Sequence, residues 1–411
     1  MAGQYRAPGF SSGEILLPAP GLALEKWAVI ACDQFTSNPS YWRAVEEAVG
    51  DAPSALRLTL PEIYLGESEA RAQSIRAAMR DVLNQNLLVP AVSDGFVLVD
   101  RMSSGGHRLG LVGCIDLDEY DYTPGAKALV RPTEGTIPQR VPPRAKIRAG
   151  APIELPHVMM LIDDPKGTLI EIIAQNRQSL RPLYDFDLMM GGGKIAGYAV
   201  EGKQAKAAVD ALDALYQKSG GLLYAVGDGN HSLAAAKSCW IEIKRALPPA
   251  DAADHPARYA LVELVNIHSP ALAFEPIHRV VTGASAASVR AAYEDYLAAR
   301  KIPVLSGEDV RLIAGDAQIG YGFDRHPLAD LQEFLLDFAA HAPGVEIDYI
   351  HGEEELRTLA AKGGVGFLVR GIDKSELFPT IREKGVLPRK AFSMGEAHDK
   401  RYYLEARALS N

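Results

Sequence analysis

The feature that most constrains the fold is a short apolar segment followed by a glycine-rich turn and an alanine-rich helix. Residues 222–226 (LLYAV) predict a buried strand, and residues 227–232 (GDGNHS) place a glycine on each side of Asp228. A helix is expected from Leu233 to Pro248. A strand, a sharp turn and a helix in this order are typical of mixed α/β proteins.

The start of this helix predicts an anion site. Asn230 is a suitable N-cap, and the N–H groups of His231, Ser232 and Leu233 are expected to point into open space. Unpaired donors and the positive end of a helix favour a bound phosphate. We expect His231 to add a charge-assisted contact, and Lys237 a weaker, longer-range one. An ordinary capped turn without a ligand is the alternative.

A second segment concentrates positive charge. Residues 131–148 (RPTEGTIPQRVPPRAKIR) combine arginines with four prolines and a glycine, so an irregular loop is expected. Thr133, Glu134 and Thr136 add two hydroxyls and a carboxylate. Guanidinium groups in such a loop can bind an anion, and a solvated basic linker is the alternative.

Segments typical of strands and helices alternate along the chain, and no internal repeat is visible, which predicts an α/β or α+β protein. The expected elements include helices over 67–86, 201–219, 288–300 and 328–340, strands over 27–32, 96–99, 108–114 and 310–314, and a glycine turn at 191–193. We expect two domains, residues 1–284 and residues 285–411. Aromatic and basic residues after Leu387 predict that the tail of the second domain returns to the phosphate site.

Composition excludes several classes of protein. The 411 residues carry 43 basic and 52 acidic side chains, a net charge of −9 that argues against a general nucleic-acid-binding protein. No apolar stretch approaches the length of a membrane helix, so a cytoplasmic protein without membrane contact is expected. The three cysteines are too widely separated to predict a disulfide framework or a zinc site.

Five motifs follow one another along the chain: residues 27–37 (WAVIACDQFTS), 131–138 (RPTEGTIP), 227–237 (GDGNHSLAAAK), 278–279 (HR) and 387–395 (LPRKAFSMG). In this order they resemble a family of unknown function, DUF1015. The turn is also similar to the phosphate-binding element of the ParB and sulfiredoxin superfamily, which includes CTP-binding partition proteins, ATP-using sulfiredoxins and free serine kinases. This chain has Asn230 and Ser232 where the commoner DGHHR form has a histidine and an arginine.

The resemblance implies a ParB/sulfiredoxin-like core and a small-molecule kinase. Such an enzyme would use ATP or ADP, with CTP possible, together with Mg²⁺, to phosphorylate a hydroxyl-bearing metabolite. The alternative is a ParB-like nucleotide-binding switch that forms no product, and a third reading is an interaction protein without a ligand. A homodimer is compatible with each of these readings.

Roles can be assigned to residues on this basis. Phosphoryl transfer needs donors on the phosphates, Mg²⁺, and a carboxylate that orients the acceptor. Asp33 is the first choice for that carboxylate and Glu134 the second, and Arg131 or Arg140 could replace the missing arginine. The expected residues are, for catalysis, Asp33, Glu134 and His231; for the nucleotide, Gly227, Asp228, Gly229, Asn230, His231, Ser232, Arg131, Thr133, Thr136, Arg140, His278, Arg279, Arg389 and Lys390; and for Mg²⁺, Asp228.

Overall fold

The computed structural model describes residues 2–31, 35 and 38–409. The chain divides into two units, which are described separately. Unit 1 comprises residues 1–272, 382–385 and 395–411, and unit 2 comprises residues 273–381 and 386–394. Within the described residues, no helix has both the length and the apolar character that crossing a bilayer requires.

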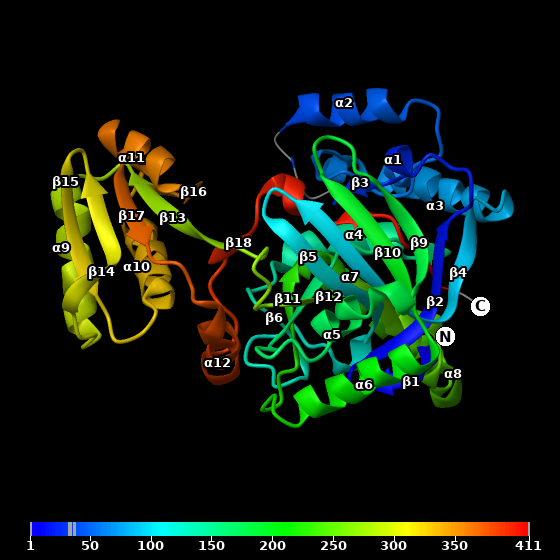
Figure 1. Ribbon diagram of the computed structural model, residues 1–411. Helices are drawn as coiled ribbons and strands as arrows, with labels where there is room; N and C mark the ends of the chain where they lie inside the picture. Colours follow the sequence, from blue (N-terminus) through cyan, green and yellow to red (C-terminus); the bar gives the residue numbers. More distant parts are fainter. Residues whose placement is uncertain (1, 32–34, 36–37, 410–411) are drawn as a thin grey trace. The chain divides into compact units, whose positions relative to one another are not determined.

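Unit 1 is built on a large mixed sheet, which has ten strands in the described part of the chain (Figure 1). The strand order is β6-β11-β8-β12-β5-β2-β4-β10-β9, and β1 pairs with β2. The strands are β1 (Ala2–Ala7), β2 (Phe10–Pro18), β4 (Leu88–Ser103), β5 (Gly106–Asp116), β6 (Val130–Pro132), β8 (Met159–Ile162), β9 (Arg181–Asp187), β10 (Lys194–Val200), β11 (Tyr224–Asp228) and β12 (Tyr259–Asn266).

Both faces of this sheet are buried. Successive residues of a strand point to opposite faces. Val97 and Val99 accordingly belong to the core that also contains residues of α2 and α3, whereas Phe96 and Leu98 belong to the core of α5, α6 and α7. The helices of unit 1 are α1 (Leu24–Trp27), α2 (Pro39–Val49), α3 (Ser68–Asn84), α4 (Val141–Arg148), α5 (Ile170–Gln175), α6 (Gly202–Tyr216), α7 (Asn230–Ala246) and α8 (Pro249–Ala253).

Short elements complete unit 1. The 3₁₀ segments are η1 (Ala55–Arg57), η2 (Glu62–Glu67), η3 (Leu117–Glu119), η4 (Pro138–Arg140), η5 (Arg177–Ser179), η6 (Pro256–Arg258) and η7 (Ala397–Asp399). Two small antiparallel ladders join β3 (Val29–Ile30) to β19 (Tyr402–Tyr403), and β7 (Ile153–Glu154) to β20 (Arg407–Ala408). Through β19 and β20, the C-terminal tail is part of unit 1.

Buried arginines fix this tail. Arg401 is 3% exposed and pairs with Glu263 at 2.9 Å and with Glu405 at 2.7 Å. Arg101, also buried, donates to the main-chain carbonyls of Asp399 and Gly192. Buried charges of this kind require partners, and Glu263 and Arg101 provide contacts to the tail from distant parts of unit 1.

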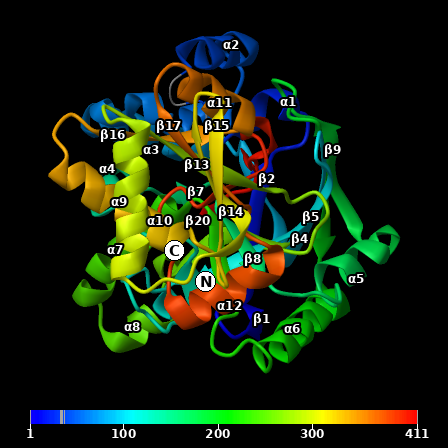
Figure 2. The same cartoon turned by 90° about the vertical axis from the view of Figure 1, so that its left-hand side faces the viewer.

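Unit 2 has a second sheet, of order β15-β14-β17-β13-β16 (Figure 2), and β18 pairs with β13. Leu368 packs with Leu356 of α11, whereas Phe367 contacts Tyr293 of α9 and Phe334 of α10, so helices cover both faces. The elements are β13 (Phe274–Thr282), α9 (Ala286–Ala299), β14 (Leu305–Ala314), β15 (Ala317–Gly322), α10 (Leu328–His341), β16 (Glu346–His351), α11 (Glu353–Ala361), β17 (Val365–Val369), α12 (Lys374–Lys384), of which residues 382–384 belong to unit 1, and β18 (Phe392–Met394).

The mixed α/β class, the β4–β5 hairpin and the glycine turn between β9 and β10 are confirmed. Two expectations are wrong. The second domain begins at residue 273, not 285, because β13 pairs with strands of unit 2. Residues 141–148 form helix α4, because Pro142 and Pro143 stand in its first turn, where proline costs no hydrogen bond.

Candidate functional site

The predicted turn lies at the end of β11, and Gly229 gives it its shape. Gly229 has φ +78°, a left-handed conformation that favours glycine. A Cβ at this position would lie 3.0 Å from both Cα and Cγ2 of Val158. Both the backbone conformation and the close packing against Val158 therefore favour glycine at this position. Gly227 and Asp228 are the last residues of β11, and helix α7 begins at Asn230.

The helix N-terminus differs from the expectation in two respects. The N-cap is Gly229, not Asn230. The N–H groups of Ser232 and Leu233 both donate to the Gly229 carbonyl, at 3.0 Å, so they are not available to a ligand. The N–H groups of Asn230 and His231 have no acceptor among the described residues, and they are the two donors left at the positive end of the 17-residue helix α7.

The Asn230 side chain ties the turn to the segment that follows β6. Its Nδ2 donates to the Glu134 carbonyl at 3.0 Å, and its Oδ1 accepts from the hydroxyls of Thr136 and Tyr120, each at 3.3 Å. Thr133 Oγ1 donates to the Val226 carbonyl at 2.8 Å. The structure thus brings Thr133, Glu134 and Thr136 to the turn, as expected.

His231 is neutral at pH 7. Burial and the nearby cations Arg140 and Arg144 lower its pKa to about 4. Its Nε2 accepts from the Ile137 N–H at 3.1 Å, so the proton of the neutral ring is on Nδ1. The expected charge-assisted contact is therefore replaced by a neutral N–H donor.

Arg140 and Arg144 bring positive charge close to the turn. Both pair with Glu62, Arg140 at 2.6 Å, which leaves one positive charge in excess over the three groups. Burial would raise the pKa of Glu62, but the two guanidinium groups outweigh it and hold that pKa below its usual value. The 131–148 segment does supply cations here, from η4 and α4.

The tail supplies a further cation. Lys400 Nζ lies 3.5 Å from Asp228 Oδ2, and the lysine side chain is only 9% exposed. Asp228 Oδ1 accepts from the Gly229 N–H at 3.0 Å, which holds the carboxylate beside the turn. Residues 395–409 belong to unit 1 and place Lys400 beside the turn, whereas the return of the tail to a bound phosphate stays a prediction.

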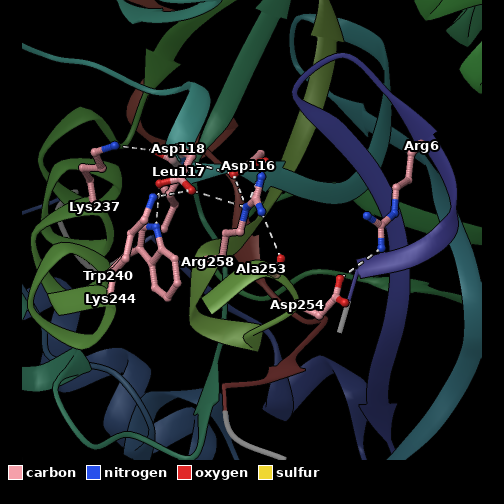
Figure 3. Close-up of polar contacts among 10 residues, drawn as sticks. All are labelled: Arg6, Asp116, Leu117, Asp118, Lys237, Trp240, Lys244, Ala253, Asp254 and Arg258. Carbon is pink, nitrogen blue, oxygen red and sulfur yellow. Dashed lines mark hydrogen bonds and ion pairs between the residues drawn. The ribbon is translucent and has the colours of Figure 1, made fainter. Parts of the chain in front are cut away.

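Other expected residues are not brought to the turn. Arg131 is buried, and its guanidinium donates to the carbonyls of Ala126 and Gly221. Gly221 lies before the start of β11, whereas the turn lies after its end, so the Arg131 side chain points away from the turn. Lys237 Nζ donates to the Leu117 carbonyl at 2.6 Å. It belongs to a polar cluster on the part of α7 that follows its second turn (Figure 3).

Four expected nucleotide contacts belong to unit 2. His278 is buried, and its Nδ1 accepts from the Val369 N–H at 3.2 Å. Arg279, fully buried, donates to the carbonyls of Arg389 and Lys390 and so holds the segment before β18. These contacts show that His278 and Arg279 have structural roles within unit 2. Nucleotide binding by these two residues and by Arg389 and Lys390 stays a prediction.

The first-choice carboxylate, Asp33, lies outside the described residues. Ala31, the last described residue before it, donates its N–H to the Arg401 carbonyl at 2.8 Å. Arg401 follows Lys400, the residue that pairs with Asp228. The described residues contain no group of three or more metal-ligating side chains, and Mg²⁺ commonly takes one or two carboxylates together with phosphate oxygens.

The sequence did not predict a chain of three hydrogen-bonded side chains beside the turn. Ser232 Oγ lies 3.2 Å from His157 Nε2, and the Tyr403 hydroxyl lies 2.7 Å from His157 Nδ1. His157 and Tyr403 are both buried. The only sequence signal was the pair of tyrosines in the tail, and His157 had none.

The fold and site define a mixed α/β protein in which two N–H groups at the start of α7 face no acceptor among the described residues and the C-terminal tail lies beside them. The chain belongs to DUF1015, a family of proteins of unknown function, whose model matches residues 16–361. The resemblance drawn from the motifs is confirmed. No curated protein matches the chain.

Solved structures resemble the chain only distantly. A free serine kinase in complex with AMP is 12% identical, with 72% of this chain and 92% of that chain covered and a TM-score of 0.39. A conserved hypothetical protein from Pyrococcus furiosus is 13% identical, with 73% and 95% covered and a TM-score of 0.34. C-terminally truncated SbnI from Staphylococcus aureus is 11% identical, with 69% and 82% covered and a TM-score of 0.36. Scores this low leave the argument for function to the residues of the chain itself.

Proposed function

We propose that unit 1 binds the phosphates of a nucleoside di- or triphosphate at the turn of residues 227–232 and transfers a phosphoryl group to a hydroxyl of a small metabolite. The observation that carries this proposal is the pair of donors at the start of α7. The Asn230 and His231 N–H groups lack acceptors among the described residues, and the helix dipole makes their position attractive to an anion.

The charges around the turn support a phosphate ligand. Lys400 is held against Asp228, and Arg140 and Arg144 together exceed Glu62 by one positive charge. A phosphate would bring at least one negative charge to this position. Lys400 can then act as the cation that the arginine of the DGHHR form would otherwise supply, because Ser232 stands at that position here.

The turn also suits Mg²⁺. Asp228 Oδ2 is buried and accepts no hydrogen bond from the described residues, and the Lys400 ammonium lies 3.5 Å from it, so this carboxylate could hold Mg²⁺ beside the proposed phosphates when Lys400 contacts the phosphate instead. Mg²⁺ bound there would neutralise charge that develops on the phosphates. Asp33 is proposed as the carboxylate that orients the acceptor hydroxyl, and Glu134 is the second choice. His231 is proposed to act as a hydrogen-bond donor through Nδ1.

A product assay tests this proposal. The protein is incubated with Mg²⁺, with ATP, ADP or CTP, and with a panel of hydroxyl metabolites that includes serine, and phosphorylated products are sought by mass spectrometry. We expect product from wild type, loss of product with Asp33→Asn, and reduced nucleotide binding with His231→Ala. Asp185→Asn is the matched control, because Asp185 is exposed and, within the described part of the chain, its ion-pair partner is Lys194 of the same hairpin.

The outcomes separate the three readings. Product formation supports a kinase. Nucleotide binding without product from any acceptor contradicts phosphoryl transfer and favours a nucleotide-dependent switch. Absence of nucleotide binding contradicts the proposal as a whole.

A further inference from the structure

A cavity of about 160 Å³ lies in unit 1 beside the first turn of α7. Most of its wall is apolar, with Leu60, Met79, Ile147, Leu155 and Val158 among the lining residues. An apolar cavity of roughly this volume holds a group the size of benzene. The cavity is therefore large enough for a compact apolar group of about six carbons.

One end of the cavity is polar. Ser232, His157 and Tyr403 all line it and form a hydrogen-bonded line, with Ser232 Oγ 3.2 Å from His157 Nε2 and the Tyr403 hydroxyl 2.7 Å from His157 Nδ1. When Nδ1–H donates to the tyrosine oxygen, Nε2 is the acceptor and can take a proton from the serine hydroxyl. A serine held in this way can receive a hydrogen bond from a ligand hydroxyl.

The charged part of the wall favours an anion. Arg144 and Arg148 line the cavity, together with Glu62 and Glu154. Arg140 also pairs with Glu62, and Arg407 with Glu154, so four guanidinium groups face two carboxylates and leave two positive charges in excess.

Arg148 has an unused donor at this wall. Its Nη1 donates to Glu154, whereas its Nη2 is buried without a hydrogen-bond partner among the described residues. A buried guanidinium N–H without an acceptor is rare in folded proteins, and a ligand oxygen would satisfy it. A carboxylate is the group that guanidinium binds with the best geometry.

We propose that this cavity binds a small hydroxy acid with an apolar side chain. The apolar group occupies the cavity, the carboxylate is bound by Arg148 and Arg144, and the hydroxyl lies toward Ser232. Several elements of unit 1 supply these groups: the apolar wall comes from α3 and α4 among others, the cations from α4, and the hydroxyl partner from α7.

The assignment of this ligand as the phosphoryl acceptor rests on the proposed function. In that reaction the ligand hydroxyl oxygen forms a bond to the terminal phosphorus of the nucleotide, and the bond from that phosphorus to the nucleotide's bridging oxygen breaks. The hydroxyl proton passes to Ser232 Oγ as the serine proton passes to His157 Nε2. The leaving nucleotide keeps the bridging oxygen and its electron pair.

Isothermal titration calorimetry without nucleotide tests the site. The probes are 2-hydroxy-4-methylpentanoate, 4-methylpentanoate, which lacks the hydroxyl, 3-methylbutan-1-ol, which lacks the carboxylate, and lactate, which lacks the apolar group. We expect the complete hydroxy acid to bind about tenfold more tightly than each partial probe, a difference of about 1.4 kcal/mol. Lactate binding as tightly as 2-hydroxy-4-methylpentanoate would overturn the proposal.

Three variants isolate the three recognition elements. Ser232→Ala is expected to give 2-hydroxy-4-methylpentanoate and 4-methylpentanoate the same affinity. Arg148→Gln should remove most of the affinity that the carboxylate contributes. Leu155→Trp should fill the cavity and abolish binding. Arg181→Gln is the matched control, because Arg181 is exposed and pairs with Glu201 away from the cavity. Unchanged affinity in Leu155→Trp would place the ligand elsewhere and refute the site.

A parallel titration with ADP separates this inference from the proposed function. Binding of the hydroxy acid without binding of ADP supports the cavity site and refutes its role as an acceptor site. Binding of ADP without binding of any probe refutes the cavity site alone. If both bind, His157→Gln in the transfer assay is expected to lower kcat with little change in the KM of the hydroxy acid, and an unchanged kcat would refute the proton path.

Discussion

Replacing Gly229 with alanine should destabilise unit 1 and weaken its anion site. The left-handed φ of +78° costs a non-glycine residue roughly 1–2 kcal/mol. The new Cβ would also lie 3.0 Å from the Val158 Cα, so main chain must move, which costs a further ~1–3 kcal/mol. The two contributions add to about 3 kcal/mol of lost stability.

Urea denaturation followed by tryptophan fluorescence measures this loss in unit 1. All three tryptophans, Trp27, Trp42 and Trp240, are buried in that unit, so their fluorescence reports its unfolding separately from unit 2. The free energy of unfolding follows from the midpoint and the slope of the transition.

Gly191→Ala provides the control for the backbone cost alone. Gly191 also has positive φ, +73°, but a Cβ there would meet nothing within 4 Å. We expect it to cost about 1 kcal/mol and to leave ADP affinity unchanged. Equal losses of stability in the two variants would refute the inferred contact between Gly229 and Val158.

Three further predictions concern the tail and the turn. Arg401→Met removes the nearest cation from the buried carboxylates of Glu263 and Glu405, leaving Glu263 with Arg108 at 3.7 Å. The variant should destabilise unit 1 by about 3 kcal/mol in the same fluorescence assay, and a loss below about 1 kcal/mol would contradict the buried ion pairs. Lys400→Met should weaken ADP binding about tenfold in calorimetry, and unchanged affinity would exclude a phosphate contact. His231 is neutral in the fold with a pKa of about 4 but takes up a proton in the unfolded chain below pH 6.5, so the unfolded state is favoured as the pH falls from 6.5 toward 4. His231→Gln should therefore reduce the difference between urea midpoints at pH 7 and pH 5, and an unaltered difference would show that another group is responsible.

Local signals predicted much of the fold. The strand before the turn, the turn and the helix after it are determined by residues close together in the sequence. The structure has β11 and α7 at the predicted positions. The N-cap was mistaken because the Asn230 side chain bonds to Thr136 and Tyr120 instead of to its own helix. The contacts of the Asn230 side chain with distant residues, which the local sequence does not show, therefore determined which residue caps the helix.

The candidate site was harder to predict because it joins distant segments. His157 lies 75 residues from Ser232 and 246 from Tyr403 along the chain. Lys400 reaches Asp228 because Arg401, Arg101 and the strand pairings of the tail fix that segment within unit 1. Arg131 has the charge that composition favours, but its position in β6, beside Ala225, directs it away from the turn.

Nucleotide phosphates are proposed to bind at the start of α7. An experimental structure of the protein with ADP and Mg²⁺ tests this proposal. We expect phosphate oxygens within hydrogen-bond distance of the Asn230 and His231 N–H groups, with the Lys400 ammonium close to the same phosphate. ADP bound elsewhere, or a turn without phosphate at saturating ADP, would contradict it.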